Sequence, residues 1–270
     1  MIVQVRDGLK VNLLESGSGE ATPLLLIHGL GGSAETWGEE ILGRLSRDRR
    51  VVAVDLPGHG ASDAPTEPGR FALAAIVSDL EDVLSCLDIE SAIWAGYSMG
   101  GRIALGAGLF APQRVAALIL ESASPGLEDE LARQDRRRSD ERLARRMESD
   151  GIQAYLDARE ELPVFASQRR LAPEVRRSLR DQLATNDPAA LAACLRGLGQ
   201  GMQPPLWRAL GHISAPVLLL VGALDEKYLR INEQMLVALP AARLVVAPAA
   251  GHNVHFETPG AWLSAVETFL

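Results

Sequence analysis

The sequence predicts an α/β protein in which helices flank a mostly parallel sheet, and two observations lead to this prediction. First, short runs rich in apolar and β-branched residues end in turn-forming residues, at positions 24–27, 51–54, 92–95, 117–120, 217–221 and 244–246. Such runs are typical of strands buried on both faces of a parallel sheet. Second, helical patterns lie between them, most clearly at 73–87, 99–110, 229–239 and 260–270. Alternating strands and helices predict right-handed crossovers within one sheet.

The N-terminal residues 1–17 read as two short strands, which we expect to form an antiparallel edge of the sheet. They contain neither a basic leader with an apolar core nor a small-residue cleavage site. Secretory signal peptides carry both features. We therefore expect a cytoplasmic protein.

The alternation stops between residues 122 and 210, where charged helical stretches follow one another without a strand pattern. Prolines separate these stretches, at Pro163, Pro173, Pro188, Pro204 and Pro205. A chain of 270 residues suits one large α/β domain. We predict a single domain with a core of residues 1–121 and 211–270 and an all-helical cap of residues 122–210, inserted over one sheet edge.

The net charge of −8 argues against nucleic acid as a partner, because binding to its backbone depends on clustered positive charge. No apolar run reaches the roughly 18 residues of a membrane span, so we expect no membrane partner. The segment 133–146 departs from the acidic average, with seven arginines in fourteen positions. By itself it indicates a solvated helix face with interspersed acidic residues. The sequence does not indicate an oligomeric state.

The two cysteines, Cys86 and Cys194, lie far apart in apolar, helical stretches. Their spacing fits neither a CxxC redox pair nor a zinc site. Free cysteines are among the most buried residues, so we expect two buried thiols.

The segment GYSMG at 96–100 follows a predicted strand and opens a predicted helix. A G-x-S-x-G motif in this context is typical of a nucleophile elbow. The turn strains the serine, and the flanking glycines remove Cβ clashes with the strand and helix. We therefore expect Ser98 to be the catalytic serine.

A serine hydroxyl needs a neighbouring histidine to take its proton. His252 lies after the last predicted strand, which suits the chain order Ser, Asp, His; His255 is its rival and is expected to pack at the start of the final helix. Asp225 follows the strand at 217–221 and is the expected orienting acid, with Glu226 left as an alternative.

His28 and His59 lie beside glycines at strand ends and are expected to shape loops through hydrogen bonds. Asp55, in the segment DLPGHG, precedes the serine in the chain and is expected to be structural. The glycines of HGLGG at 28–32 let the backbone turn its N–H groups towards the serine. The N–H groups of Leu30 and Met99 would then form an oxyanion hole.

The same glycines also fit a dinucleotide-binding fingerprint, G-x-G-x-x-A, with Asp55 at the end of the next strand. Two predicted strands precede the strand before these glycines, however, whereas the fingerprint follows the first strand of its fold. The dinucleotide alternative also leaves the elbow, Asp225 and His252 without a role. The motifs together favour an α/β-hydrolase fold, with a mostly parallel central sheet flanked by helices and an all-helical cap insertion.

The chain resembles one family of this superfamily, the menaquinone-pathway enzymes that make 2-succinyl-6-hydroxy-2,4-cyclohexadiene-1-carboxylate (SHCHC synthases). The resemblance extends from about residue 2 to the C-terminus, through HGLGGSAETW, DLPGHGASD, GYSMGGRIAL, SASPGL, LPVFAS, GALDEKY and AGHNVHFE. HG, DLPGHG and G-x-S-x-G are common to the superfamily. GYSMGGR, SPGL before an arginine-rich helix, and LPVFAS are more specific.

The resemblance implies a lyase rather than a hydrolase, acting on a substrate with three carboxylates and a pyruvoyl enol ether. Ser98, activated by His252 and Asp225, would abstract a ring proton, and pyruvate would leave. The resemblance implies no cofactor and no metal. It implies that Arg102, Arg136 and Tyr97 bind this small anionic substrate, since a guanidinium holds a carboxylate through two parallel hydrogen bonds.

Two positions in the cap depart from the family pattern. Arg159 stands where the family usually has a tryptophan, and Leu183 stands where it has an arginine. If both differences hold in the fold, they weaken the substrate assignment and leave the triad intact; Arg180 is close enough in sequence to substitute for the missing arginine.

Three other functions remain open at this stage. A carboxylesterase or thioesterase would use the same triad through an acyl-enzyme, and fold alone does not separate it from a lyase. A long apolar tunnel would favour the esterase, and an anion-binding pocket the lyase. A non-catalytic binding protein would tolerate loss of the triad, and a dinucleotide enzyme would bind nucleotide.

Overall fold

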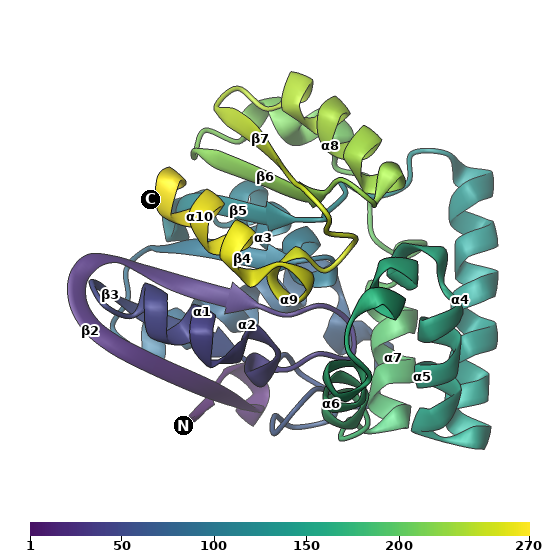
Figure 1. Ribbon diagram of the computed structural model, residues 1–270. Helices are drawn as coiled ribbons and strands as arrows, with labels where there is room; N and C mark the ends of the chain where they lie inside the picture. Colours follow the sequence, from purple (N-terminus) through teal and green to yellow (C-terminus); the bar gives the residue numbers. More distant parts are fainter.

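The computed structural model describes residues 1–270 and contains one seven-stranded sheet with helices on both faces (Figure 1). The strands are paired in the order β1-β2-β4-β5-β6-β7, with β3 paired to β2. β1 pairs antiparallel with β2, and the pairs from β2–β4 to β6–β7 are parallel. This confirms the predicted sheet. The bounds are β1 Ile2–Gln4, β2 Lys10–Ile27, β3 Arg49–Val54, β4 Ala92–Tyr97, β5 Val115–Glu121, β6 Val217–Gly222 and β7 Ala242–Ala247.

The second N-terminal strand and the run at 24–27 are one continuous strand, β2, which the sequence pattern split in two. β2 bends back on itself (Figure 1), and both of its ends pair with β3: Leu24–Ile27 run alongside Val51–Val54, and Leu13–Ser16 face them in reverse order. The bend needs glycine, because a Cβ on Gly19 would lie 2.0 Å from the carbonyl oxygen of Asp48.

Two hydrophobic cores lie on the two faces of the sheet. Leu25 and Ile27 belong to one core, together with side chains of α2, α3 and α8; Leu24 and Leu26 belong to the other, with side chains of α1, α9 and α10. This division follows from the strand geometry, since successive side chains point to opposite faces. The helices span α1 Gly38–Leu45, α2 Leu73–Cys86, α3 Met99–Phe110, α8 Glu226–Ala238, α9 Val254–Glu257 and α10 Pro259–Phe269.

Four helices follow one another between β5 and β6, and no strand lies between Glu121 and Val217. In Figure 1 they stand to one side of the sheet. Their side chains form a third, smaller hydrophobic cluster. We call them the cap helices; the division of the chain into core and cap remains a prediction. Their bounds are α4 Glu130–Asp150, α5 Ile152–Glu161, α6 Pro173–Leu183 and α7 Pro188–Leu198, and a 3₁₀ segment, Pro163–Arg170, joins α5 to α6.

The two thiols differ in exposure, which corrects one prediction. Cys194 is buried, with its Sγ 3.7 Å from the sulfur of Met99, whereas Cys86 is exposed. Cys86 is the last residue of α2, next to exposed Ser85 and off the helix face formed by the buried residues Leu80, Val83 and Leu84. No helix of the structure is both long enough and apolar enough to cross a membrane.

Candidate active site

Ser98 connects β4 to α3 with φ 51° and ψ −104°, a backbone conformation that is strained for a residue with a Cβ. The flanking glycines permit this sharp turn. A Cβ on Gly96 would lie 2.2 Å from the backbone of Gly100, and a Cβ on Gly100 would lie 2.0 Å from the carbonyl oxygen of Ile27. The serine hydroxyl is therefore presented at the N-terminus of α3, whose first N–H groups have no partner within the helix.

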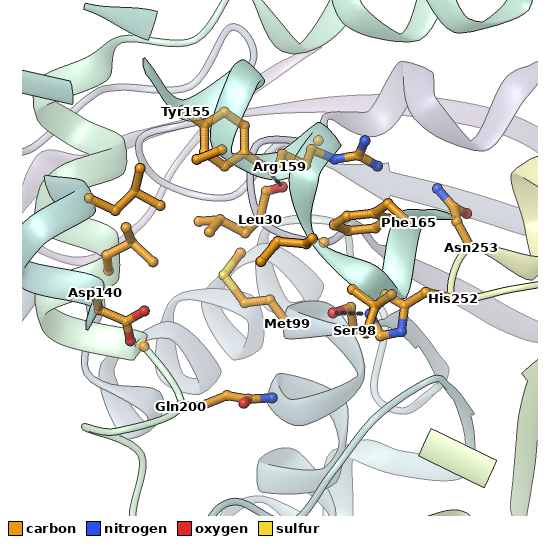
Figure 2. Close-up of a pocket in the computed structure, with 18 of the residues that line it drawn as sticks. Leu30, Ser98, Met99, Asp140, Tyr155, Arg159, Phe165, Gln200, His252 and Asn253 are labelled. Atoms are coloured by element: carbon orange, nitrogen blue, oxygen red, sulfur yellow. Dashed lines mark hydrogen bonds between the residues drawn. The ribbon is translucent and has the colours of Figure 1, made fainter. Parts of the chain in front are cut away.

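The structure brings the three predicted triad members together. His252 Nε2 lies 3.0 Å from Ser98 Oγ (Figure 2), and His252 Nδ1 lies 2.5 Å from Asp225 Oδ2. Asp225 and His252 come from the loops after β6 and β7. These loops lie so close together that a Cβ on Gly222 would be 2.1 Å from the carbonyl oxygen of Gly251. The arrangement is that of a serine activated by an oriented imidazole.

The two alternatives for these roles are placed elsewhere. Glu226 pairs with Arg230 on the exposed first turn of α8. His255 Nδ1 lies 2.8 Å from a carboxylate oxygen of buried Glu121, and its ring stacks on Trp37. His255 thus pairs with Glu121 rather than with Ser98 and forms part of the cavity wall, at the start of the short helix α9 rather than of the final helix.

The remaining buried polar residues near the site hold its loops in place, as predicted. Asp55 accepts hydrogen bonds from the N–H groups of Ala34 and Ala61 and from the amide of Asn12. Asp55 is also only 3% exposed, so its carboxylate is not accessible to a ribose, which argues against the dinucleotide alternative. His28 Nε2 accepts from the N–H of Leu56.

Both residues of the predicted oxyanion hole, Leu30 and Met99, line a cavity together with Ser98. Cap side chains fix the Leu30 loop through its carbonyl groups: Tyr155 donates to Leu30 O at 2.7 Å, and the amide of Asn186 donates to Gly31 O at 2.7 Å. Two different segments of the cap therefore set the orientation of this loop.

The cavity has a volume of about 590 Å³ and lies between the sheet loops and the cap helices. Every predicted site residue except Asp225, which lies behind His252, lines it. Positive charge dominates the wall: six cationic side chains face one carboxylate, Asp140. The cations are Arg102, Arg136, Arg142, Arg146, Arg159 and Lys227.

The two predicted arginines have different surroundings. Arg102 is buried, and its Nη1 donates to Leu198 O at 2.9 Å and to Gln203 Oε1 at 2.6 Å. Burial lowers the pKa of Arg102 to about 10, so it remains a cation at neutral pH. Arg136 is partly exposed and binds Asp140 at 2.8 Å and Gln200 at 3.0 Å.

Tyr97 lies beside the triad, with its ring packed edge-on against the His252 ring. Burial raises its pKa well above the usual value, so its hydroxyl stays protonated and can donate a hydrogen bond. Sequence reasoning missed several other lining residues, including Tyr155, Phe165 and Tyr228. Phe165 lies in LPVFAS and Tyr228 lies in GALDEKY, two of the segments that carry the family resemblance, so the sequence could have indicated both residues.

The comparisons with known proteins agree with this geometry. The family model described as "alpha/beta hydrolase fold" matches residues 22–259. A Bacillus subtilis (strain 168) protein, provisionally named as a 2-succinyl-6-hydroxy-2,4-cyclohexadiene-1-carboxylate synthase, is 37% identical over 99% of this chain and 97% of its own length.

Two solved structures are also similar over nearly their full length. MenH from S. aureus has a TM-score of 0.91 and 30% identity, covering 96% of this chain and 97% of that one. An esterase from Thermogutta terrifontis, solved with malate bound, has a TM-score of 0.85 and 28% identity, covering 99% and 97%. The chain belongs to the α/β-hydrolase fold family and, within it, to the SHCHC synthase family.

Proposed function

We propose that this protein is a carbon–oxygen lyase of menaquinone biosynthesis. It eliminates pyruvate from 2-succinyl-5-enolpyruvyl-6-hydroxy-3-cyclohexene-1-carboxylate and yields SHCHC. The observation that carries the proposal is the charge of the cavity, because six cations and one carboxylate line the cavity that contains Ser98 and His252. Such a wall suits a substrate with three carboxylates. Two of these cations, Arg102 and Arg159, are buried and hydrogen-bond only to neutral groups of the protein, so an anionic ligand would supply the counter-charge that they lack.

In this reaction His252 Nε2 takes the proton of Ser98 Oγ, and the serine oxygen abstracts a proton from the substrate ring. The electron pair of the broken C–H bond enters the rearranging double bonds, and the C–O bond between the ring and the enolpyruvyl group breaks. Enolpyruvate leaves with that oxygen and its bonding electrons. The proton held by the Ser98–His252 pair is then given up to the methylene carbon of enolpyruvate, which yields pyruvate and restores the triad. Asp225 keeps the imidazole in the required tautomer and stabilises its protonated form.

The backbone N–H groups of Leu30 and Met99 would stabilise the negative charge that develops on a ring carboxylate. Arg102 and Arg136 would bind substrate carboxylates, and Tyr97 would donate a hydrogen bond beside the reacting carbon. Arg136 would exchange its contact with Asp140 for the substrate. The proposal includes a small anionic substrate and the cytoplasmic location expected from the sequence.

A second candidate is a carboxylesterase that acts through an acyl-enzyme on Ser98. The triad distances suit this chemistry equally well, and the similar Thermogutta protein is named as an esterase. The wall of the cavity is also partly apolar, with 15 hydrophobic residues among 33. Charge recognition is the property that separates the two functions.

The test is pyruvate release from the enolpyruvyl substrate, generated in situ and followed with lactate dehydrogenase and NADH. Hydrolysis of p-nitrophenyl acetate is measured in parallel. Rapid release that disappears in Ser98→Ala supports the lyase. Ester hydrolysis with pyruvate release at the uncatalysed rate would replace it with the esterase.

A further inference from the structure

Arg159 lies near the end of α5 in the wall that the cap contributes to the cavity. Its guanidinium carbon is 3.8 Å from the centroid of the Phe165 ring, and its Nη1 donates to Gln168 Oε1 at 3.1 Å. The residue is 8% exposed. Phe165 and Gln168 thus hold one face and one edge of the guanidinium, which fixes the plane of this cation.

The charge of Arg159 has no acidic partner. No carboxylate lies within ion-pair distance of it, although most arginines of the cap helices pair with Asp or Glu. The other guanidinium nitrogens of Arg159 are not among the buried donors that lack a hydrogen-bond partner, so they remain accessible. A desolvated cation is costly unless it meets an anion. Arg159 lines the cavity on one side and a smaller neighbouring pocket on the other, so its open N–H groups are accessible and lack the counter-charge they require.

Arg159 also stands apart from the other cationic part of the wall. Figure 2 shows it beside Phe165 and Asn253, while Asp140 and Gln200, the two partners of Arg136, are drawn away from it, beyond Leu30 and Met99. Two separate sources of positive charge in one cavity suit a ligand with carboxylates at both ends.

We propose that Arg159 binds one carboxylate of the substrate while Arg102 and Arg136 bind another at the far end of the cavity. This inference rests on the proposed function and assigns the residue that fixes the second end of the substrate. Stacking on Phe165 orients the guanidinium so that its free edge can form two parallel hydrogen bonds. A lysine lacks this planar fork.

The test is a calorimetric titration with 2-succinylbenzoate, a stable aromatic dicarboxylate, and with its dimethyl ester. Ser98→Ala serves as the background, so that the ester is not hydrolysed. Arg159→Gln should weaken dicarboxylate binding by roughly 10- to 100-fold, the loss expected for a charge-assisted hydrogen-bond pair. The affinity of Arg159→Lys for the dicarboxylate should lie between that of the Ser98→Ala background and that of Arg159→Gln. The affinity of Arg159→Gln for the dimethyl ester should change less than twofold.

Arg177→Gln is the matched control, because Arg177 is exposed on α6 and lines neither cavity that contains Arg159. It removes the same charge and should leave binding unchanged. In the active enzyme Arg159→Gln should raise KM and leave kcat within a few-fold. Circular dichroism verifies that each variant is folded.

Dicarboxylate binding by Arg159→Gln that matches the Arg177→Gln control would overturn the inference. Equal weakening of acid and ester would also overturn it, since Arg159 would then only support the packing of Phe165. Absence of pyruvate release by the unmodified enzyme would refute the proposed lyase instead, and the titration would still decide whether Arg159 binds a carboxylate.

Discussion

The two walls of the cavity are built in different ways. On the sheet side, Ser98, Asp225 and His252 sit in loops at the ends of β4, β6 and β7, where glycines leave no room for a Cβ. On the cap side, Arg136 and Arg159 reach in from two helices through long side chains. The backbone thus fixes the reacting atoms, and side-chain contacts fix the charges. Substitutions in the loops on the sheet side should abolish chemistry or folding, and those of the cavity cations, on the cap helices or on α3, should alter selectivity.

Ser98→Ala should have the largest effect. Removing the nucleophile or base of a triad lowers kcat by about 10³-fold or more, and the smaller side chain fits the same backbone. We expect pyruvate release near background and an almost unchanged midpoint of thermal unfolding. Activity within tenfold of the unmodified enzyme would refute the assigned role of the serine.

Gly100→Ala tests whether the backbone of the elbow is as tightly packed as the structure indicates. Its Cβ would lie 2.0 Å from the carbonyl oxygen of Ile27, so strand and helix must move apart. We expect the free energy of unfolding in urea to fall by about 3 kcal/mol or more.

Gly43→Ala is the control for that substitution. Gly43 lies within α1, and no atom lies within 4 Å of the place that a Cβ would occupy, so alanine should stabilise the helix by about 0.5–1 kcal/mol. Similar effects of the two substitutions would contradict the tight packing of the elbow.

Arg102→Gln tests the link between charge and selectivity. It removes a cavity cation, and we expect kcat/KM for the anionic substrate to fall by roughly 10- to 100-fold, with at most a few-fold change for p-nitrophenyl acetate. Arg138→Gln, on the exposed face of α4, is the control and should change neither rate. Equal losses on both substrates would indicate damaged folding rather than lost recognition.

The last prediction concerns stability and pH and leaves the chemistry of the site unchanged. Burial lowers the pKa of His59 to about 3, and burial also lowers the pKa of His28. An unfolded histidine has a pKa of about 6.5, so below that pH the unfolded chain binds a proton that the folded chain excludes. Stability should therefore fall as pH decreases from about 6.5 towards 3, by about 2 kcal/mol between pH 7 and 5 from His59 alone.

Urea unfolding at pH 7 and pH 5 measures this loss. His59→Asn keeps a donor for the carbonyl of Pro57, which Nδ1 of His59 contacts, and removes the titrating ring. The variant should lose less stability on acidification than the unmodified protein. An identical pH dependence in both proteins would show that His59 does not contribute.

The sequence by itself determined the parallel sheet, the elbow, the order of Ser98, Asp225 and His252, and the structural role of Asp55. Each of these depends on backbone geometry, which short motifs of glycine and apolar residues encode locally. The motifs LPVFAS and GALDEKY likewise marked segments that contribute Phe165 and Tyr228 to the cavity.

Only the tertiary structure decided which arginines face the cavity. Arg142 and Arg146 are exposed, as expected of a solvated helix face, and also line the cavity. Arg159, a departure from the family pattern, contacts Phe165 and Gln168. Local sequence patterns also did not predict that Cys86 is exposed, or that two predicted strands join into β2. These features depend on how distant segments pack, because the surroundings of a long side chain are set by neighbours that the local sequence does not specify.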